Sequence, residues 1–462
     1  MKQWQRVFVT GILGMAGGWG GEGGSYYRAP LSYSTVRDPD PPKYVRRAGE
    51  ERWWGGSGVE WLDLGLDHRV RYEYRDDDLR RGRAGLDEPF LYRTRMYAGV
   101  HGLVDPFRLA VEVQDARRYG SAYPRDVRDV NEFEVIRLYG ELWFGEALGR
   151  DALGNGRPLS LRWGIHNFEF LDRRLLGNNQ WRNTANTFVG FHGSLGQEKN
   201  DWQLDLLAVQ PLLRRKYEWD EPVEGQWLFG AIGHWRVWSD VATVEPYWLV
   251  LDQGGSGLVP ERNVQSPGVR VYGKLGESGF DYDASVTGQF GNSAEGDVRA
   301  LGATGELGYR FGGAMQPRLS VFYGYASGDR EPGDGEDNRF ERFYGFGRPW
   351  SANDYILYEN ISAPKVRVEL TPHRKLRADF GYSWYWLASG KDRFLTSLAR
   401  DRSGGSGSFL GHEFDIRARW QLHPQAELTA GYAHFADGEY TRKAIRPGDT
   451  DFFYLELSLR AF

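Results

Sequence analysis

Hydrophobic and polar positions alternate along most of this chain with a period of two residues. The last twelve residues, 451–462, read DFFYLELSLRAF, and their apolar and polar side chains fall on opposite faces of an extended strand. The same alternation recurs upstream, where the charged face is too dense to be a protein core and must therefore contact water. Clear examples are the runs 62–75, 90–101, 280–289 and 413–420. We count about eighteen such runs, which predicts an all-β fold, a transmembrane antiparallel β-barrel with lipid outside and a polar lumen inside.

The links between these runs alternate in length. Short links fall at Asp105-Pro106, Ser239-Asp240, Thr371-Pro372-His373 and His423-Pro424. Long polar links fall at 76–88, 118–130, 214–225, 328–354, 390–408 and 437–450. A transmembrane barrel sorts its links in this way, with short periplasmic turns and long extracellular loops, whereas a soluble sandwich has no reason to. Residues 146–158 form an unusually long link on the side of the short turns.

Composition narrows the class of protein. Aromatic residues make up 15% of the 462 residues, charged residues 26%, and the mean hydropathy is −0.58. Such a hydrophilic chain cannot be a helical membrane protein, but it suits a barrel in which alternate residues face lipid and Trp and Tyr gather at the two interfaces. The absence of cysteine suits an exported bacterial protein and excludes lipoprotein processing. The net charge of −5 comes without the basic stripe of a nucleic-acid-binding protein.

The first 58 residues lack the alternation. Lys2 and Arg6 precede an apolar stretch and then glycines, so we expect a secretory signal peptide over 1–24, although no clear A-x-A cleavage site follows. Residues 25–58 are rich in Pro, Arg and Tyr, and we expect an irregular amino-terminal extension rather than an inserted plug. About thirty residues are too few for the plug domain of an energised transporter. The barrel is expected over 59–462.

Catalytic chemistry has little support in the sequence. Nine histidines and many carboxylates make chance pairs unavoidable, and no nucleophile elbow, H-E-x-x-H or phosphate-binding loop occurs. The acidic stretch 329–338 could hold calcium, but its spacing matches no EF-hand, and a solvated loop facing lipopolysaccharide is the favoured interpretation. We expect no catalytic residue, no metal site and no cofactor. A barrel enzyme, or an adhesin displaying the loop at 328–354, is the alternative from a different class.

Inward-facing arginines are the candidate site residues. A pore that passes an anion needs positive charge on its lumen wall. The arginines that face inward by parity are Arg69, Arg71, Arg93, Arg95, Arg162, Arg367, Arg377, Arg417 and Arg419. The alternative role for them is to neutralise inward carboxylates, namely Asp63, Asp67, Glu112, Glu369, Asp379 and Asp415. The sequence does not say which arginines set selectivity.

The stretch 161–190, LRWGIHNFEFLDRRLLGNNQWRNTANTFVG, resembles the signature of the alginate export family of outer-membrane channels. The residues that match the family pattern are Gly164, Asp172, Arg174-Leu175, Trp181, Thr187-Phe188 and Gly190. Residues 411–462, Arg348-Pro349-Trp350 and Asp354-Tyr355 are also similar to the family. The chain departs from the family pattern at Ile165, His166, Asn186 and Val189, where polar groups that could touch an anionic polymer are missing.

The resemblance implies a passive channel of the bacterial outer membrane that carries an anionic polysaccharide or a related solute. A porin for small molecules is the alternative within transport. The loop carrying Asp172, Arg174 and Trp181 would narrow the lumen beside the arginines. The expected partners are outer-membrane lipid, lipopolysaccharide, the solute, and the barrel-insertion machinery, which reads a terminal Phe; we expect no nucleic acid.

Overall fold

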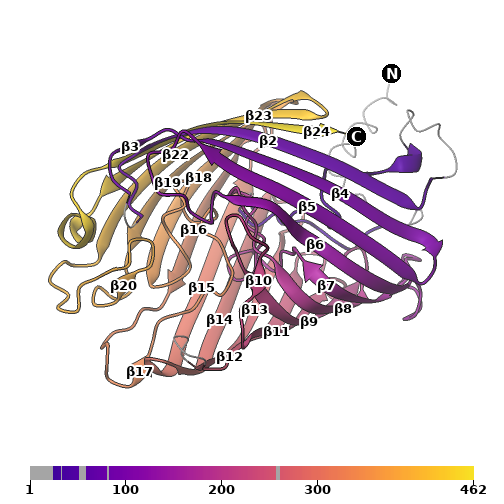
Figure 1. The fold of residues 1–462 in the computed structure, drawn as a ribbon, viewed down its shortest axis with the longest axis horizontal. Helices are drawn as coiled ribbons and strands as arrows, with labels where there is room; N and C mark the ends of the chain where they lie inside the picture. The colour runs from indigo at the N-terminus through magenta and orange to yellow at the C-terminus, as the bar shows by residue number, and fades with distance from the viewer. Residues whose placement is uncertain (1–23, 33, 51–58, 81–82, 256–260, 462) are drawn as a thin grey trace.

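Eighteen long strands form one closed antiparallel β-barrel in a computed structural model that describes residues 24–32, 34–50, 59–80, 83–255 and 261–461 (Figure 1). The predicted fold class and strand number are thereby confirmed. The barrel strands are β2 (Leu62–Asp76), β4 (Phe90–Val104), β5 (Phe107–Tyr119), β6 (Asn131–Phe144), β7 (Leu159–His166), β8 (Phe188–Gly196), β9 (Trp202–Leu213), β11 (Gln226–Trp235), β12 (Thr243–Gln253), β13 (Arg262–Lys274), β14 (Phe280–Ser293), β15 (Gly296–Arg310), β16 (Arg318–Ala326), β18 (Ile361–His373), β19 (Leu376–Trp386), β22 (Phe409–His423), β23 (Ala426–Asp437) and β24 (Thr450–Ala461). In this part of the chain, no helix is long and apolar enough to cross a membrane.

The barrel closes where the first long strand pairs with the last. Strand β2 pairs with β24 from Leu66 opposite Ala461 to Asp76 opposite Asp451, and with β4 on its other side. Closure gives the backbone donors and acceptors of both strands a partner, which a sheet in a membrane requires because lipid offers none. The terminal Phe462 lies outside the described residues.

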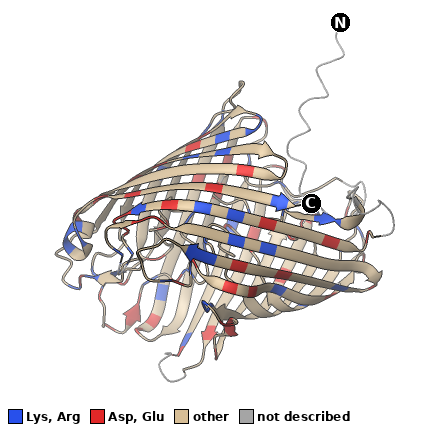
Figure 2. Ribbon diagram, turned by 45° about the horizontal axis from the view of Figure 1, so that its top comes forward, with Lys and Arg blue, Asp and Glu red and all other residues tan. Residues whose placement is uncertain are grey.

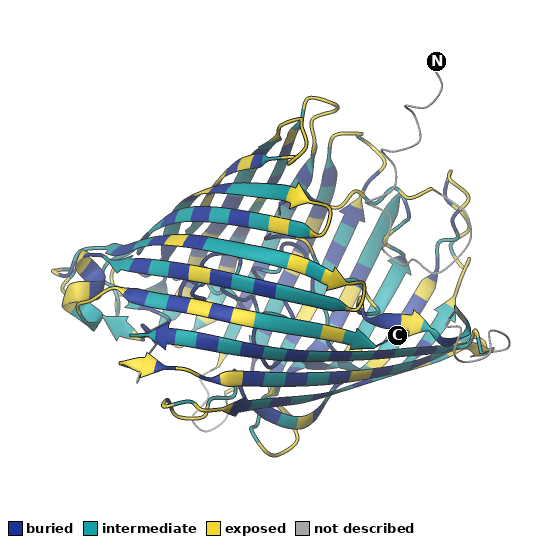
Figure 3. Ribbon diagram, turned by 90° about the horizontal axis from the view of Figure 1, so that it is seen from above, coloured by how far each residue is buried: buried dark blue, intermediate teal, exposed yellow. Residues whose placement is uncertain are grey.

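The two faces of each strand differ as the alternation predicts. Along β2, buried and half-buried residues alternate over all fifteen positions, and the charged residues occupy the buried ones (Figures 2 and 3). Large apolar side chains such as Leu206, Trp248 and Tyr323 are exposed on the outer surface. Charge therefore lines the inside of the wall, and an apolar band surrounds it.

The links sort by length with two exceptions. Strands β14 and β15 are joined by a tight turn between Ser293 and Gly296 on the side of the long loops, which the loop-length argument did not predict. Thr371, Pro372 and His373 belong to the end of β18, so the turn to β19 lies one step later than expected. The long link 145–158 is present on the turn side, where Asn200 Nδ2 donates to Asp151 at 2.7 Å.

Short elements decorate the barrel. They leave its topology unchanged: β1 (Val45–Arg47), η1 (Ala48–Glu50), β3 (Leu86–Asp87), β10 (Glu221–Pro222), β17 (Glu336–Asp337), β20 (Arg393–Phe394), β21 (Ala399–Arg400) and η3 (Thr441–Ile445). Strands β1, β3, β10 and β17 pair with barrel strands, whereas β20 and β21 pair with each other. Strand β1 pairs with β2 at Asp63 to Gly65, on the edge of β2 that β24 leaves open. The amino-terminal segment is therefore joined to the wall next to the carboxyl-terminal strand.

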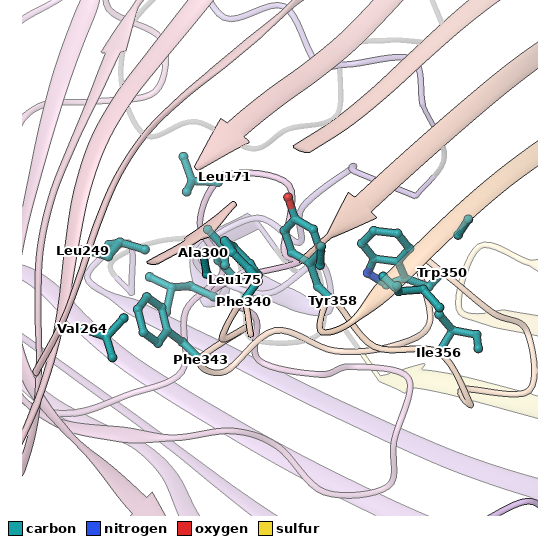
Figure 4. Close-up of a cluster of buried hydrophobic side chains, with 14 of the residues drawn as sticks. Leu171, Leu175, Leu249, Val264, Ala300, Phe340, Phe343, Trp350, Ile356 and Tyr358 are labelled. Carbon is teal, nitrogen blue, oxygen red and sulfur yellow. The ribbon is translucent and has the colours of Figure 1, made fainter. Parts of the chain in front are cut away.

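Two long loops fold into the lumen. Loop 167–187 connects β7 to β8, and loop 327–360 connects β16 to β18; Leu175, Phe340 and Trp350 in these loops are almost fully buried. They pack in one cluster against inward apolar residues of the wall such as Leu249 and Val264 (Figure 4). The wall formed by β9 to β16 is therefore partly apolar inside, and the loops bury their aromatic side chains against it.

The residues described before the barrel, 24–32 and 34–50, are irregular apart from β1 and η1. Their contacts are with lumen-facing groups: Ser32 Oγ donates to Glu306 at 2.7 Å, and Arg37 lies 3.3 Å from Glu198. The predicted signal peptide, apart from Gly24, and Trp53-Trp54 lie outside the described residues. The boundaries of the signal peptide and extension stay a prediction.

Arg318 provides a test of the inward charge network. Its side chain is 1% exposed and binds three carboxylates, those of Asp281, Glu306 and Glu369. Changing Arg318→Gln leaves the buried Asp281 carboxylate and the half-buried Glu306 and Glu369 carboxylates without their cation, and should lower the free energy of unfolding by about 3–5 kcal/mol. Urea unfolding, followed by the heat-dependent gel mobility of the folded barrel, measures this.

The matched control is Arg299→Gln. Arg299 pairs with Glu336 at 2.8 Å, but its side chain is 66% exposed. Its loss should change the free energy of unfolding by less than about 1 kcal/mol. Equal unfolding midpoints for the Arg318 and Arg299 variants would contradict the assigned role of the buried network.

Candidate functional site

Four predicted arginines gather on one patch of the lumen wall. Arg69 and Arg71 lie two residues apart on β2, Arg93 and Arg95 lie two apart on β4, and the register places Arg69 opposite Arg93. Two-residue spacing puts each pair on the inner face. We call these four residues the basic patch. The structure thus brings together the candidates that parity alone could only assign to the inside.

The basic patch holds the backbone of loop 167–187. Arg93 Nη1 donates to the carbonyl of Gln180 at 3.0 Å, and Arg71 Nη1 donates to the carbonyl of Trp181 at 2.7 Å. Arg69 donates to the carbonyls of Gln180 and Arg182, and Arg95 donates to the Gln180 side chain. Charged donors make stronger hydrogen bonds than neutral ones. The loop is therefore fixed across the lumen at residues 180–182.

Carboxylates neutralise only part of the basic patch. Asp67 lies 3.3 Å from Arg93, Glu73 lies 2.7 Å from Arg71, and Glu456 lies 3.2 Å from Arg71. Four guanidinium groups thus face three carboxylates, and Glu73 also binds Arg75. The patch therefore keeps an excess of positive charge. The loop carbonyls stabilise this charge by hydrogen bonding but do not neutralise it.

Trp181 joins the two inner loops. The guanidinium carbon of Arg71 lies 4.1 Å from the centre of its ring, and that of Arg348, in loop 327–360, lies 3.7 Å from it. The ring also makes an edge contact with Tyr454 of β24, with centroids 4.8 Å apart. Trp181 is therefore a cation–π bridge between the wall and the second loop.

A small arginine-rich cavity of about 30 Å³, large enough for one water molecule, lies at the loop-side end of the basic patch. Its lining comes from strand ends and loops: Arg71, Glu73, Arg75, Arg80, Arg83, Arg128, Asp129, Trp181, Arg182, Asn353, Asp354 and Phe452. Among the described residues, no carboxylate lies within ion-pair distance of the Arg128 guanidinium. Burial, with Arg182 and Arg80 nearby, lowers the pKa of Arg128 to about 9. We call this space the outer cavity.

A larger cavity lies at the turn-side end of the lumen. It has a volume of about 660 Å³ and is bounded by the amino-terminal segment, β4 to β9 and the start of loop 167–187. Arg162, a predicted site residue, lines it and binds Glu141 at 2.9 Å. We call this space the inner vestibule. The two cavities place arginines at both ends of the lumen.

The other predicted site residues lie apart from the basic patch. Asp172 and Arg174 bind each other at 3.0 Å, and Arg174 lies over the rings of Phe322 and Trp350, so this pair contributes to the docking of the loop. Arg367, Arg417 and Arg419 all approach Asp379. Arg377 is on the same strand face but is exposed near the β18–β19 turn. Parity placed the wall arginines on the inside, and the family resemblance gave the loop pair, but neither indicated that these residues lie apart from the basic patch.

Several groups that complete the site were missed. Glu456, Arg348 and Asp40 contact predicted residues, and Arg137 binds Asp40 beside Arg162, yet the candidate set contained none of these four. Glu456 and Arg137 lie on inward positions of β24 and β6, so parity could have identified them. Arg348 lies in a stretch with family resemblance. No signal in the sequence placed Asp40 in the lumen.

The acidic loop does not assemble a metal site in the described part of the chain, where no group of three or more His, Asp or Glu could hold an ion. Asp329 lies 3.3 Å from Arg400, and Asp337 lies 3.7 Å from Arg339. Arginines thus occupy the space around two of its carboxylates.

The structure explains why two positions of the signature are glycines. Gly164 of β7 pairs with Gly190 of β8, and both have positive φ, +132° and +147°. A Cβ at Gly164 would collide with the carbonyl oxygen of Leu138, and one at Gly190 with that of Ala208. Only glycine allows the strands to approach this closely where loop 167–187 leaves the wall.

These features define an outer-membrane β-barrel channel, and the comparisons with known proteins agree. The sequence model of the family described as "Alginate export" matches residues 60–452. The chain therefore belongs to the alginate export family, as its motifs indicated, and its location is the bacterial outer membrane. A search of curated proteins finds no match.

Solved structures share the fold at low identity. Acinetobacter baumannii OccAB3 is 12% identical with a TM-score of 0.62, over 87% of this chain and 99% of that one. Pseudomonas aeruginosa OpdK with vanillate is 13% identical with a TM-score of 0.61, over 86% and 98%. Pseudomonas aeruginosa OprD is 14% identical with a TM-score of 0.53, over 86% and 93%.

Trp181→Ala tests the bridge between the loops. Two cation–π contacts disappear, which should weaken docking of residues 178–183 by about 1–3 kcal/mol and raise their amide exchange accordingly. Hydrogen–deuterium exchange with mass spectrometry measures this. Trp238→Ala, a 66% exposed tryptophan in the β11–β12 link, is the control and should leave loop 167–187 unchanged. Unaltered exchange at 178–183 in the Trp181 variant would contradict the bridge.

The environment of Glu169, in loop 167–187, predicts that docking of the amino-terminal segment depends on pH. Its Oε2 accepts from the Asp38 amide at 2.9 Å, and its Oε1 has no hydrogen-bond partner among the described residues. Burial, helped by the Asp38 charge and opposed by Arg173, raises the pKa of Glu169 from 4.5 to about 7. A raised carboxyl pKa means that the folded state favours the protonated form. Docking of the amino-terminal segment is therefore strongest below about pH 4.5 and weakens as the pH rises to about 7.

Amide exchange of residues 36–40, corrected for intrinsic pH effects, should increase across that interval and level off above it. Glu169→Gln keeps a neutral side chain and should remove the dependence. A dependence that persists in the Gln variant would assign it to another group.

Proposed function

We propose that this channel passes carboxylate-bearing solutes of sugar-acid size by passive diffusion. The carrying observation is the positive excess of the basic patch, which lies between two arginine-lined cavities along the lumen. Positive groups on a pore wall attract anions and replace part of their hydration. No energy input and no cofactor is required for such passage.

The dimensions of the lumen support a small solute. Loops 167–187 and 327–360 fill part of the lumen, and the basic patch holds one of them across it. The inner vestibule, at about 660 Å³, lies within the range of pockets that bind small molecules, about 300–1,000 Å³. Aromatic rings beside guanidiniums, such as Tyr139 under Arg162 at 4.9 Å, suit the apolar face of a sugar ring.

Passage of an anionic polysaccharide is the second candidate. Membership of the alginate export family favours it, and arginines at both ends of the lumen would contact successive charges of one chain. His166, at a departure from the family pattern, donates from Nε2 to the Gly190 carbonyl at 3.1 Å and lines the inner vestibule. A series of oligouronides of increasing length separates the two candidates, since only a polysaccharide channel passes the longest.

Arg128→Gln tests the role of positive charge in the lumen at the outer cavity, without removing an ion pair seen in the described residues. A unit charge about 8 Å from a permeating anion in water is worth about 0.5 kcal/mol, so loss of it should lower uptake roughly twofold. Liposome swelling with glucuronate at low salt measures the uptake, and glucose uptake should stay unchanged.

Arg125→Gln is the matched control, because Arg125 lies in the same loop but is exposed and bonded to the Tyr217 hydroxyl. It should leave both rates unchanged. Wild-type liposomes that take up glucose but exclude glucuronate would refute the proposed function.

A further inference from the structure

Asp40, in the amino-terminal segment, occupies a site built from two arginines of the barrel wall. One of its carboxylate oxygens accepts from Arg137 Nη1 on β6, and the other accepts from Arg162 Nη1 on β7 at 2.5 Å. A carboxylate bridging two guanidiniums through separate oxygens is a strong, geometrically specific arrangement. Burial raises the pKa of Asp40, but the two arginines outweigh it and hold the pKa below its ordinary value.

The wall positions both arginines without help from Asp40. Arg137 binds Glu112 through Nε at 3.1 Å and donates from Nη2 to the Asn167 carbonyl at 3.2 Å. Arg162 binds Glu141 through Nε at 2.9 Å. These contacts use other nitrogens, so the Nη1 group of each arginine is presented to the inner vestibule. The pair is preorganised for a carboxylate from any source.

The segment before β1 that carries Asp40 is tied to the barrel by separate contacts and not by strand pairing. Its side chain is 43% exposed, and Pro39, Pro41 and Pro42 line the same vestibule. Upstream of Tyr44, the segment is tied by separate polar contacts such as Ser32 to Glu306 and Arg37 to Glu198. The Arg37–Glu198 pair, in which the Glu198 side chain is 46% exposed, contributes about 0–1 kcal/mol. Strand β1 can stay on β2 while the residues before it leave the vestibule.

We propose that Arg137 and Arg162 form a carboxylate-binding subsite at the turn-side end of the lumen, and that Asp40 is its intramolecular ligand. A solute carboxylate entering the vestibule competes with Asp40 for the same two Nη1 groups. The solute class rests on the proposed function, whereas the competition is a property of this segment. Because Asp40 is tethered beside the subsite and occupies it most of the time, a solute can bind only while the subsite is open. The apparent affinity for the solute is therefore the intrinsic affinity multiplied by the fraction of time that the subsite is open.

Binding of glucuronate to the purified full-length chain in detergent tests this, by isothermal titration calorimetry with glucose as the neutral control. Asp40→Asn removes the competing charge and should tighten glucuronate binding about tenfold, as for a site open about one tenth of the time. Adding Arg162→Gln to Asp40→Asn should abolish the gain. Heat-dependent gel mobility verifies that each variant is folded.

Glu198→Gln is the matched control, because it loosens the same segment at Arg37 and leaves Asp40 in place. It should give much less gain than Asp40→Asn. Three results would each overturn the proposal. They are equal glucuronate affinity of wild type and Asp40→Asn, an equal gain in affinity for glucose, and an equal gain in glucuronate affinity in the Glu198 variant.

A second measurement needs no change at Asp40. The chain has no cysteine, so a spin label at Lys43→Cys reports on the segment alone. Glucuronate should raise the mobility of the label, and glucose should not; an immobile label at saturating glucuronate would overturn the competition. Liposome swelling separates the two proposals. If glucuronate competes with Asp40 for the subsite but does not pass through the channel, only the channel function is refuted. If glucuronate passes but its binding does not change in the Asp40 variant, only the subsite is refuted.

Discussion

A buried guanidinium needs partners, and this requirement organises the lumen. The inward faces of β2 and β4 carry more guanidiniums than carboxylates, and the basic patch donates several of its remaining N–H groups to backbone carbonyls of loop 167–187. An uncompensated buried charge is far more unfavourable than an ordinary lost contact. The same hydrogen bonds that stabilise the arginines therefore fix the loop across the lumen, and they leave the net positive charge in place.

The opposite wall of the barrel holds the loops by apolar packing. Between β9 and β16 the inward positions include many apolar residues, and loop aromatics such as Phe340 and Trp350 pack on them. Loop 167–187 is thus held by charge on one side and by apolar packing on the other, with Trp181 and Arg348 joining the two loops. The spaces left beside the loops include the outer cavity and the inner vestibule, and arginines line both.

Much of this fold follows from the sequence because strand alternation is a local property. Parity placed Arg69, Arg93 and Arg377 on the inner face, but it carries no information on height along the barrel, so Arg377 at the rim was grouped with residues of the basic patch. The inward folding of the loops depends on contacts between segments more than a hundred residues apart. Asp40 lies in a segment without alternation, and only its three-dimensional contact with Arg137 and Arg162 shows where it sits.

The central claim is that the loop-holding arginines also give the lumen its positive field. The most direct measurement is the reversal potential of the wild-type channel in a planar bilayer across a potassium chloride gradient at low ionic strength, where screening is weakest. The account predicts a potential of the sign that marks preferential chloride passage, decreasing as salt is raised. A potential of the opposite sign, or a large conductance without ion preference, would contradict it.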